Sequence, residues 1–93
     1  MACYGGMLTL DQLRMLDALE RHGTITEAAA SLSLTQPAAS RLLARMGVAA
    51  GIELVRRRGR GVELTDAGLL LAGHARAVVD RLAAAESDMR RPP

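Results

Sequence analysis

Residues 28–41 read AAASLSLTQPAASR. The three alanines give a short helix a surface of small side chains, which a second helix can approach closely. Ser33 and Leu34 then form a turn, and Thr35 caps the next helix. Pro37 is tolerated in the first turn of that helix because its missing N–H would have no intrahelical partner. Two short helices joined by such a tight turn predict a helix-turn-helix.

The helix that follows this turn is expected over residues 36–46. Its apolar stripe, spaced for one helical face, contains Ala39, Leu43 and Met46, and this stripe should face the core. The remaining side chains are then expected to face outwards: Gln36, Pro37, Ala38, Arg41 and Arg45.

A hairpin is expected after a loop that contains Gly47 and Gly51. Two short apolar segments, residues 52–55 and 62–64, flank the run RRRGRG at residues 56–61. Two short strands around a glycine-containing turn predict a β-hairpin, here with an arginine-rich tip. Side chains alternate along a strand, so Arg56 or Arg58 can point away from the face that Arg57 occupies.

Threonine caps mark the other helices. Thr9 with Gln12 reads as a capping box for a helix that ends near His22, and Thr24 with Glu27 reads as a second box for a helix over residues 25–32. Thr65 caps the last helix, which is expected over residues 66–89. That helix carries apolar residues at heptad spacing, which is typical of a helix that pairs with another. They are Leu71, Ala75, Val78, Leu82, Ala85 and Met89.

The predicted fold class is therefore mainly α. It is a winged helix-turn-helix with a three-helix core and a two-stranded β wing, followed by a long C-terminal helix with a face suited to dimerisation. We expect a disordered lead-in over residues 1–8, the winged helix-turn-helix domain over 9–65, the long helix over 66–89 and a tail over 90–93.

Charge is unevenly distributed along the chain. The formal net charge is +2 and all twelve basic residues are arginine. Residues 40–61 carry six arginines and one acid, whereas the segments before and after them are each slightly acidic. A basic centre between acidic flanks is typical of a nucleic-acid site, although a solvated basic loop would give the same pattern.

Composition argues against several other classes of function. Tyr4 is the only aromatic residue, which disfavours an RNA-binding module that stacks bases on rings. Cys3 is the only cysteine, and the histidines, His22 and His74, are isolated. We therefore expect no disulfide, no metal site and no cofactor.

The sequence also lacks the signals of an enzyme or of a membrane protein. No paired nucleophile and base or carboxylate constellation points to an enzyme. No apolar run is long enough to span a bilayer, and no signal peptide is evident, so a cytoplasmic location is expected.

The start of the second helix carries side chains suited to reading DNA. A glutamine can pair with adenine, an arginine with guanine, and an apolar surface can contact a thymine methyl group. Gln36, Arg41 and the surface of Pro37 and Ala38 supply these three kinds of contact. The arginine-rich hairpin would then lie along the backbone or enter a narrow minor groove.

The chain resembles the LysR-type transcriptional regulators in three stretches of sequence. Residues 28–41 are similar to that family's signature of a double alanine and a leucine before a Gln-Pro-Ala-x-Ser-Arg helix start. The run GRGVELTDAG at residues 59–68 resembles the family's wing and helix start, and HAR at residues 74–76 resembles its linker helix. The resemblance covers residues 8–88.

The resemblance implies specific roles for individual residues. It implies that Gln36, Pro37, Ala38 and Arg41 face bases in double-stranded DNA, at an imperfect inverted repeat. It further implies that residues 9–65 are the DNA-binding domain and that the helix over 66–89 is the linker helix. This linker helix would pair antiparallel with that of a second copy to form a homodimer. Residues implied to touch phosphate or to position the recognition helix are Thr24, Thr35, Ser40 and Arg45, and the wing contacts are Arg57 and Arg60.

The chain departs from the family pattern at three places. Met46-Gly47 replaces the usual Leu-Glu, so Gly47 is expected to loosen the end of the recognition helix. Val55 replaces a phenylalanine and leaves a smaller apolar plug under the wing. The family continues into a larger effector-binding domain, which is absent from this chain, so no small-molecule effector site is predicted here.

Two alternatives remain open. One is a different winged-helix family, such as the molybdate-responsive regulators. The other is a stand-alone domain that pairs through its last helix with other regulators rather than binding DNA itself.

Overall fold

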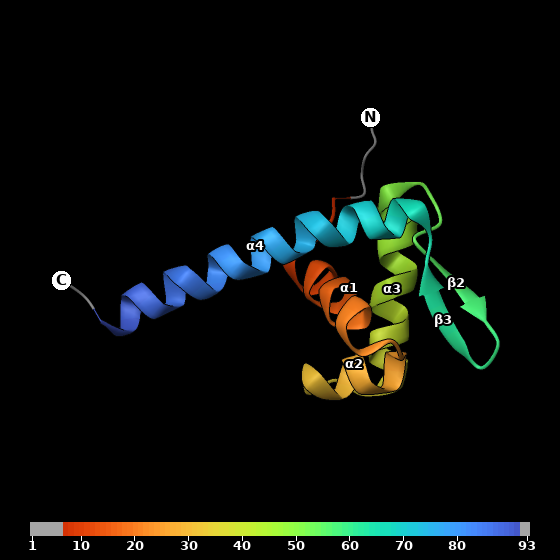
Figure 1. The fold of residues 1–93 in the computed structure, drawn as a ribbon, viewed down its shortest axis with the longest axis horizontal. Helices are drawn as coiled ribbons and strands as arrows, with labels where there is room; N and C mark the ends of the chain where they lie inside the picture. The colour runs from red at the N-terminus through yellow and green to blue at the C-terminus, as the bar shows by residue number, and fades with distance from the viewer. Residues whose placement is uncertain (1–6, 92–93) are drawn as a thin grey trace.

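The computed structural model describes residues 7–91, which form a three-helix body, a hairpin and a long helix (Figure 1). The predicted disordered lead-in lies outside the described residues as far as residue 6. Leu8, which that prediction included, packs against the core. The elements are α1 (Leu10–His22), α2 (Ile25–Ser31), α3 (Gln36–Ala50), β2 (Val55–Arg58), β3 (Gly61–Leu64) and α4 (Asp66–Arg90).

Each helix begins at the threonine that the sequence predicted. At α1 both arms of the capping box form: Gln12 N donates to Thr9 Oγ1 at 3.2 Å, and Thr9 N donates to Gln12 Oε1 at 3.0 Å. Gly23 ends this helix in the left-handed conformation, at a φ of 84°. Such local signals fix helix starts because the cap satisfies N–H groups that have no intrahelical partner.

The core consists of two clusters on either side of α1. The first joins α1 to α2 and α3 through buried small and medium side chains, namely Met15, Ala18, Leu19, Ala28, Ala29 and Ala39. The second joins α1 to the end of α3, the base of the hairpin and α4, through Leu16, Met46, Leu54 and Ala72. The alanines of α2 allow the close helix approach that the sequence predicted.

Helix α3 is longer than predicted. It continues from Met46 to Ala50 and passes through Gly47 without interruption. The loop expected at Gly47 is therefore wrong, since Gly51 ends the helix at a φ of 72°. The loosening expected from Gly47 stays a prediction. A left-handed residue after the last turn is the usual site for a helix-ending glycine.

The first strand is displaced from its predicted position, whereas β3 contains the predicted residues 62–64. β2 is Val55–Arg58, so the first three arginines of the run lie in the strand and not at the tip. Leu54 lies before the strand, where its carbonyl oxygen accepts from Thr65 N at 3.0 Å. This contact between segments distant in sequence places residues 52–54 at the base of the hairpin.

Helix α4 extends far beyond the body. The N-terminal half of α4 crosses α1, and the C-terminal part of α4 projects away from the other elements (Figure 1). A 25-residue helix is about 37 Å long at ~1.5 Å per residue. The protein is correspondingly elongated, with principal extents of 48 × 35 × 22 Å.

Candidate nucleic-acid interface

The N-terminal half of α3 presents the side chains that the sequence predicted to read DNA. Thr35 caps the helix, its Oγ1 accepting from Ala38 N at 3.3 Å. Gln36, Pro37 and Arg41 are exposed, and Ala38 is half-buried. The apolar stripe behind them faces the core, because Ala39 and Met46 are fully buried. The predicted division of α3 into an inner and an outer face is thus confirmed.

Gln36 and Ser40 are joined across one turn of α3. Gln36 Nε2 donates to Ser40 Oγ at 3.0 Å. A glutamine amide has two N–H donors and one carbonyl acceptor, so one N–H and the carbonyl oxygen remain available. Ser40 therefore orients the Gln36 amide while leaving it the donor and acceptor that a paired contact with adenine requires.

Thr24 performs a similar structural task at the start of α2. Its Oγ1 accepts from Glu27 N at 3.1 Å and also donates to Glu27 Oε1 at 3.2 Å. The Glu27 carboxylate therefore binds the Thr24 hydroxyl and not the Thr24 backbone N–H, so only the first arm of the predicted capping box forms. The side chain is exposed. Thr24 thus holds the first turn of α2, the helix that packs against both α1 and α3.

The register of the wing divides its arginines between two faces. Val55 pairs with Leu64, Arg56 with Glu63, Arg57 with Val62 and Arg58 with Gly61. Directly opposed residues share a face and successive residues alternate, so Arg57 lies on the face that carries the core-packed valines. Arg56 and Arg58 lie on the other face, as alternation predicted.

Glu63 holds both arginines of that second face. Its two carboxylate oxygens accept from Arg56 Nε and Arg58 Nη1, each at 2.8 Å. These two hydrogen bonds lower the pKa of the Glu63 carboxyl, and the bond that Arg56 donates to Glu63 raises the pKa of Arg56. The sequence prediction did not single out Glu63, although the hairpin pairing places it opposite Arg56.

The remaining arginines of the basic segment are free of acidic partners within residues 7–91. Arg41, Arg45, Arg57 and Arg60 are all exposed and form no ion pair there. α3 and the hairpin lie beside each other at one end of the protein (Figure 1). The two elements thus combine to give a basic region in which four guanidinium groups remain available to a ligand.

The predicted heptad residues of α4 divide into two groups. Ala75 is fully buried by the chain's own atoms, and half-buried Leu71 packs against the second core cluster. These two positions pack on the body of the protein, which leaves the heptad residues from Val78 onward as the candidates for a partner surface. Val78 and Met89 are 42% and 75% exposed, Ala85 is exposed and Leu82 is half-buried. The sequence prediction overlooked Leu69 and Leu70, which are also exposed.

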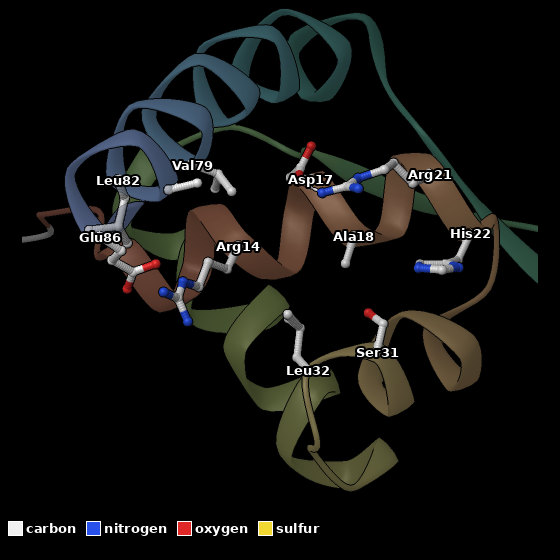
Figure 2. Close-up of a pocket in the computed structure, with 11 residues that line it drawn as sticks. Arg14, Asp17, Ala18, Arg21, His22, Ser31, Leu32, Val79, Leu82 and Glu86 are labelled. Carbon is white, nitrogen blue, oxygen red and sulfur yellow. Dashed lines mark hydrogen bonds and ion pairs between the residues drawn. The ribbon is translucent and has the colours of Figure 1, made fainter. Parts of the chain in front are cut away.

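A groove lies between α1, the end of α2 and the projecting part of α4 (Figure 2). Its volume is about 270 Å³, and its lining includes Arg14, Leu32, Leu82 and Glu86. Asp17 and Arg21 point toward each other on α1, with Arg21 Nη2 2.7 Å from Asp17 Oδ2. The described lining contains none of the side chains predicted to contact DNA, so this groove is separate from the basic region.

Other kinds of site find no support in residues 7–91. No group of three histidine, cysteine or acidic side chains there could hold a metal ion. Over the same span, no helix has the length and apolar character needed to cross a bilayer.

The capped α2–turn–α3 unit and the hairpin that follows it define a winged helix-turn-helix. Residues 10–69 match the family model described as bacterial regulatory helix-turn-helix protein, lysR family. The chain therefore belongs to the lysR family and corresponds to its winged helix-turn-helix DNA-binding domain.

Curated relatives of this chain are transcriptional regulators. It is similar to the HTH-type transcriptional regulator GbpR of Azospirillum brasilense, at 40% identity over 82 residues, covering 88% of this chain and 24% of the relative. It is also similar to the HTH-type transcriptional regulator CbbR of Rhodospirillum rubrum, at 38% identity, covering 86% of this chain and 27% of the relative. The chain spans about a quarter of the length of these relatives.

Solved structures with the same fold include complexes with DNA. The BenM DBD with catB site 1 DNA has a TM-score of 0.80 and 28% identity, covering 89% of this chain and 93% of that one. The CbnR DBD–DNA complex has a TM-score of 0.76 and 31% identity, covering 89% of this chain and 94% of that one. Oxidised OxyR of Corynebacterium glutamicum has a TM-score of 0.88 and 28% identity, covering 98% of this chain and 28% of that one.

Proposed function

We propose that this chain binds double-stranded DNA sequence-specifically as the DNA-binding part of a cytoplasmic LysR-type transcriptional regulator. In this proposal α3 enters the major groove and the wing lies along the backbone or in the minor groove. The observation that carries it is the basic region itself. Four exposed arginines have no acidic partner among the described residues: two lie on the capped helix α3, whose start offers Gln36, and two lie on the neighbouring wing.

The proposal gives different tasks to α3 and the wing. Gln36 and Arg41 lie on the exposed face of α3, with the apolar surface of Pro37 and Ala38 beside them, and they read base edges. Thr24, Thr35 and Ser40 position the helices through the hydrogen bonds described above, and Arg45 contacts phosphate. Arg57 and Arg60 neutralise phosphate charge from the wing.

We further propose a homodimer formed through the projecting part of α4. The C-terminal part of α4 projects from the body (Figure 1). The candidate contacts are Val78, Ala85 and Met89, which are exposed, and Leu82, which is half-buried. A dimer would place two copies of α3 in successive major grooves, about 34 Å apart or a small multiple of that distance. The site would then be an imperfect inverted repeat.

Substitution of one arginine in each element tests the division of tasks. Arg41→Ala should relax base preference and weaken the best site by about 1–3 kcal/mol, because one base contact is lost. Arg60→Ala should weaken all sequences alike and flatten the dependence of affinity on salt by roughly one phosphate contact. Both effects are measured by titrating a selected duplex and a scrambled one at several salt concentrations.

Arg81→Ala is the matched control. Arg81 is an exposed arginine on α4, outside the basic region, so its loss changes the net charge equally. If Arg41→Ala discriminates between the two duplexes as well as the parent protein does, the base-reading role of α3 is wrong. If Arg60→Ala and Arg81→Ala give the same salt dependence, the wing does not touch the backbone.

A further inference from the structure

Glu63 is the one acidic side chain among the described residues that binds two arginines of the wing. Its carboxylate spans the hairpin and accepts 2.8 Å hydrogen bonds from Arg56 on the same rung and from Arg58 two residues further along β2. The guanidinium groups are largely in solvent, with side-chain exposures of 54% and 77%. Arg56, Arg58 and Glu63 lie outside both core clusters.

The arginines of the wing therefore differ in what they can offer a phosphate. Arg57 and Arg60 have no carboxylate partner within the described chain. Arg56 and Arg58 must first give up charge-assisted hydrogen bonds, which are stronger than bonds between neutral groups. Either arginine would also leave the Glu63 charge near the phosphates, where like charges repel.

We propose that Glu63 is a specificity-determining residue that withholds Arg56 and Arg58 from the DNA backbone. This inference rests on the proposed function, since it assumes that the wing faces DNA. Contacts with phosphate strengthen binding to every sequence, while base contacts distinguish one sequence from another. By keeping two arginines of the wing occupied, Glu63 limits sequence-independent binding and leaves discrimination to α3.

The test measures the affinity of the parent protein and of its Glu63→Gln variant, both as the full chain, for duplexes of random sequence at several salt concentrations. Glutamine keeps the shape of the side chain and removes its charge. If both released arginines reach phosphates, the slope of log affinity against log salt steepens by about 0.9 for each. At low salt the variant would then bind random duplex more tightly than the parent protein does. Between ~50 and ~200 mM salt its affinity would fall by a factor about ten times larger than the factor for the parent.

Glu53→Gln is the matched control, because Glu53 is an exposed acid near the base of the same hairpin and has no ion pair in residues 7–91. An effect of net charge alone would appear equally in both variants. The triple variant Arg56→Gln/Arg58→Gln/Glu63→Gln should lose the gain of Glu63→Gln. Thermal unfolding followed by circular dichroism checks that each variant remains folded.

The outcomes separate this inference from the function on which it rests. Equal salt slopes for Glu63→Gln and Glu53→Gln, or a gain that persists in the triple variant, would overturn the role of Glu63. The variant Arg57→Gln/Arg60→Gln tests the wing itself: an unchanged slope there means that the wing is not on DNA and that the proposed function is wrong in that part. A reduced slope there, with no response from Glu63→Gln, overturns only the inference about Glu63.

Discussion

At the scale of single residues, Gly68 is where α4 meets the base of the hairpin. A Cβ atom at Gly68 would collide with the backbone carbonyl oxygen of Leu54, and would lie 3.3 Å from the Cβ of Leu64. Thr65 fixes the same junction, since its Oγ1 donates to Glu53 O at 2.7 Å and accepts from Gly68 N at 3.0 Å. The absent side chain of Gly68 thus lets β3 turn directly into α4.

This close approach predicts opposite effects at two glycines of α4. Gly68→Ala should lower the free energy of unfolding by about 2–3 kcal/mol, because neither backbone can easily move away. Gly73→Ala, in the same helix with no other atom within 4 Å of the added Cβ, should raise it by about 0.5–1 kcal/mol. Urea unfolding measures both changes. Equal effects of the two substitutions would show that the junction is looser than described.

At the scale of elements, α1 is joined to α4 by an ion pair as well as by packing. The Asp17 side chain is only 3% exposed, and its Oδ1 lies 3.7 Å from Arg76 Nη1 of α4. Oδ1 has no hydrogen-bond partner among the described residues. Its other oxygen binds Arg21, and this bond raises the pKa of Arg21. A buried carboxylate therefore lies at the crossing of the two helices, supported by two half-exposed arginines.

Removing this charge should weaken the crossing. Asp17→Asn should lower the free energy of unfolding by about 1–3 kcal/mol, because the amide cannot satisfy both arginines and remains buried. Asp80→Asn is the control: Asp80 pairs with the same Arg76 at 3.3 Å, but its side chain is 64% exposed. An exposed pair contributes at most about 1 kcal/mol. If denaturant titration finds the control as damaging as Asp17→Asn, the buried carboxylate does not stabilise the α1–α4 crossing.

Helix starts could be predicted from the sequence more accurately than ends or strands. An N-cap threonine accepts a hydrogen bond from the backbone N–H three residues later, so the signal is local. All four threonine caps form where expected. The end of α3 was misplaced because a helix tolerates Gly47, whereas the stop at Gly51 depends on its left-handed backbone. The first strand was misplaced because its position depends on contacts distant in sequence, such as Thr65 with Leu54.

The candidate site was predictable to a similar degree. The outward face of α3 follows from helical spacing, and the sequence placed it correctly. The pairing of Arg56 and Arg58 with Glu63 required the hairpin register, and the burial of Ala75 required the crossing of α1 with α4. Those features depend on tertiary contacts that no local pattern specifies.

At the scale of the whole molecule, the shape separates a compact body from a projecting helix. The body carries the basic region on α3 and the wing, while the C-terminal part of α4 projects away from it (Figure 1). Val78 and Met89 are exposed apolar residues of this helix. A small domain buries a limited share of its surface, so a partner along α4 would add stability as well as symmetry. Two-fold symmetry of the protein would be matched by two-fold symmetry of its site.

Selection of bound sequences from a pool of random DNA duplexes, with the mass of the complex recorded alongside, tests the central claim most directly. Our account predicts that moderate salt enriches an imperfect inverted repeat and that two chains occupy each duplex. Binding without enrichment would reduce the chain to a basic module that does not distinguish sequences. No binding at all would contradict the account and would favour a domain that acts by pairing with other proteins.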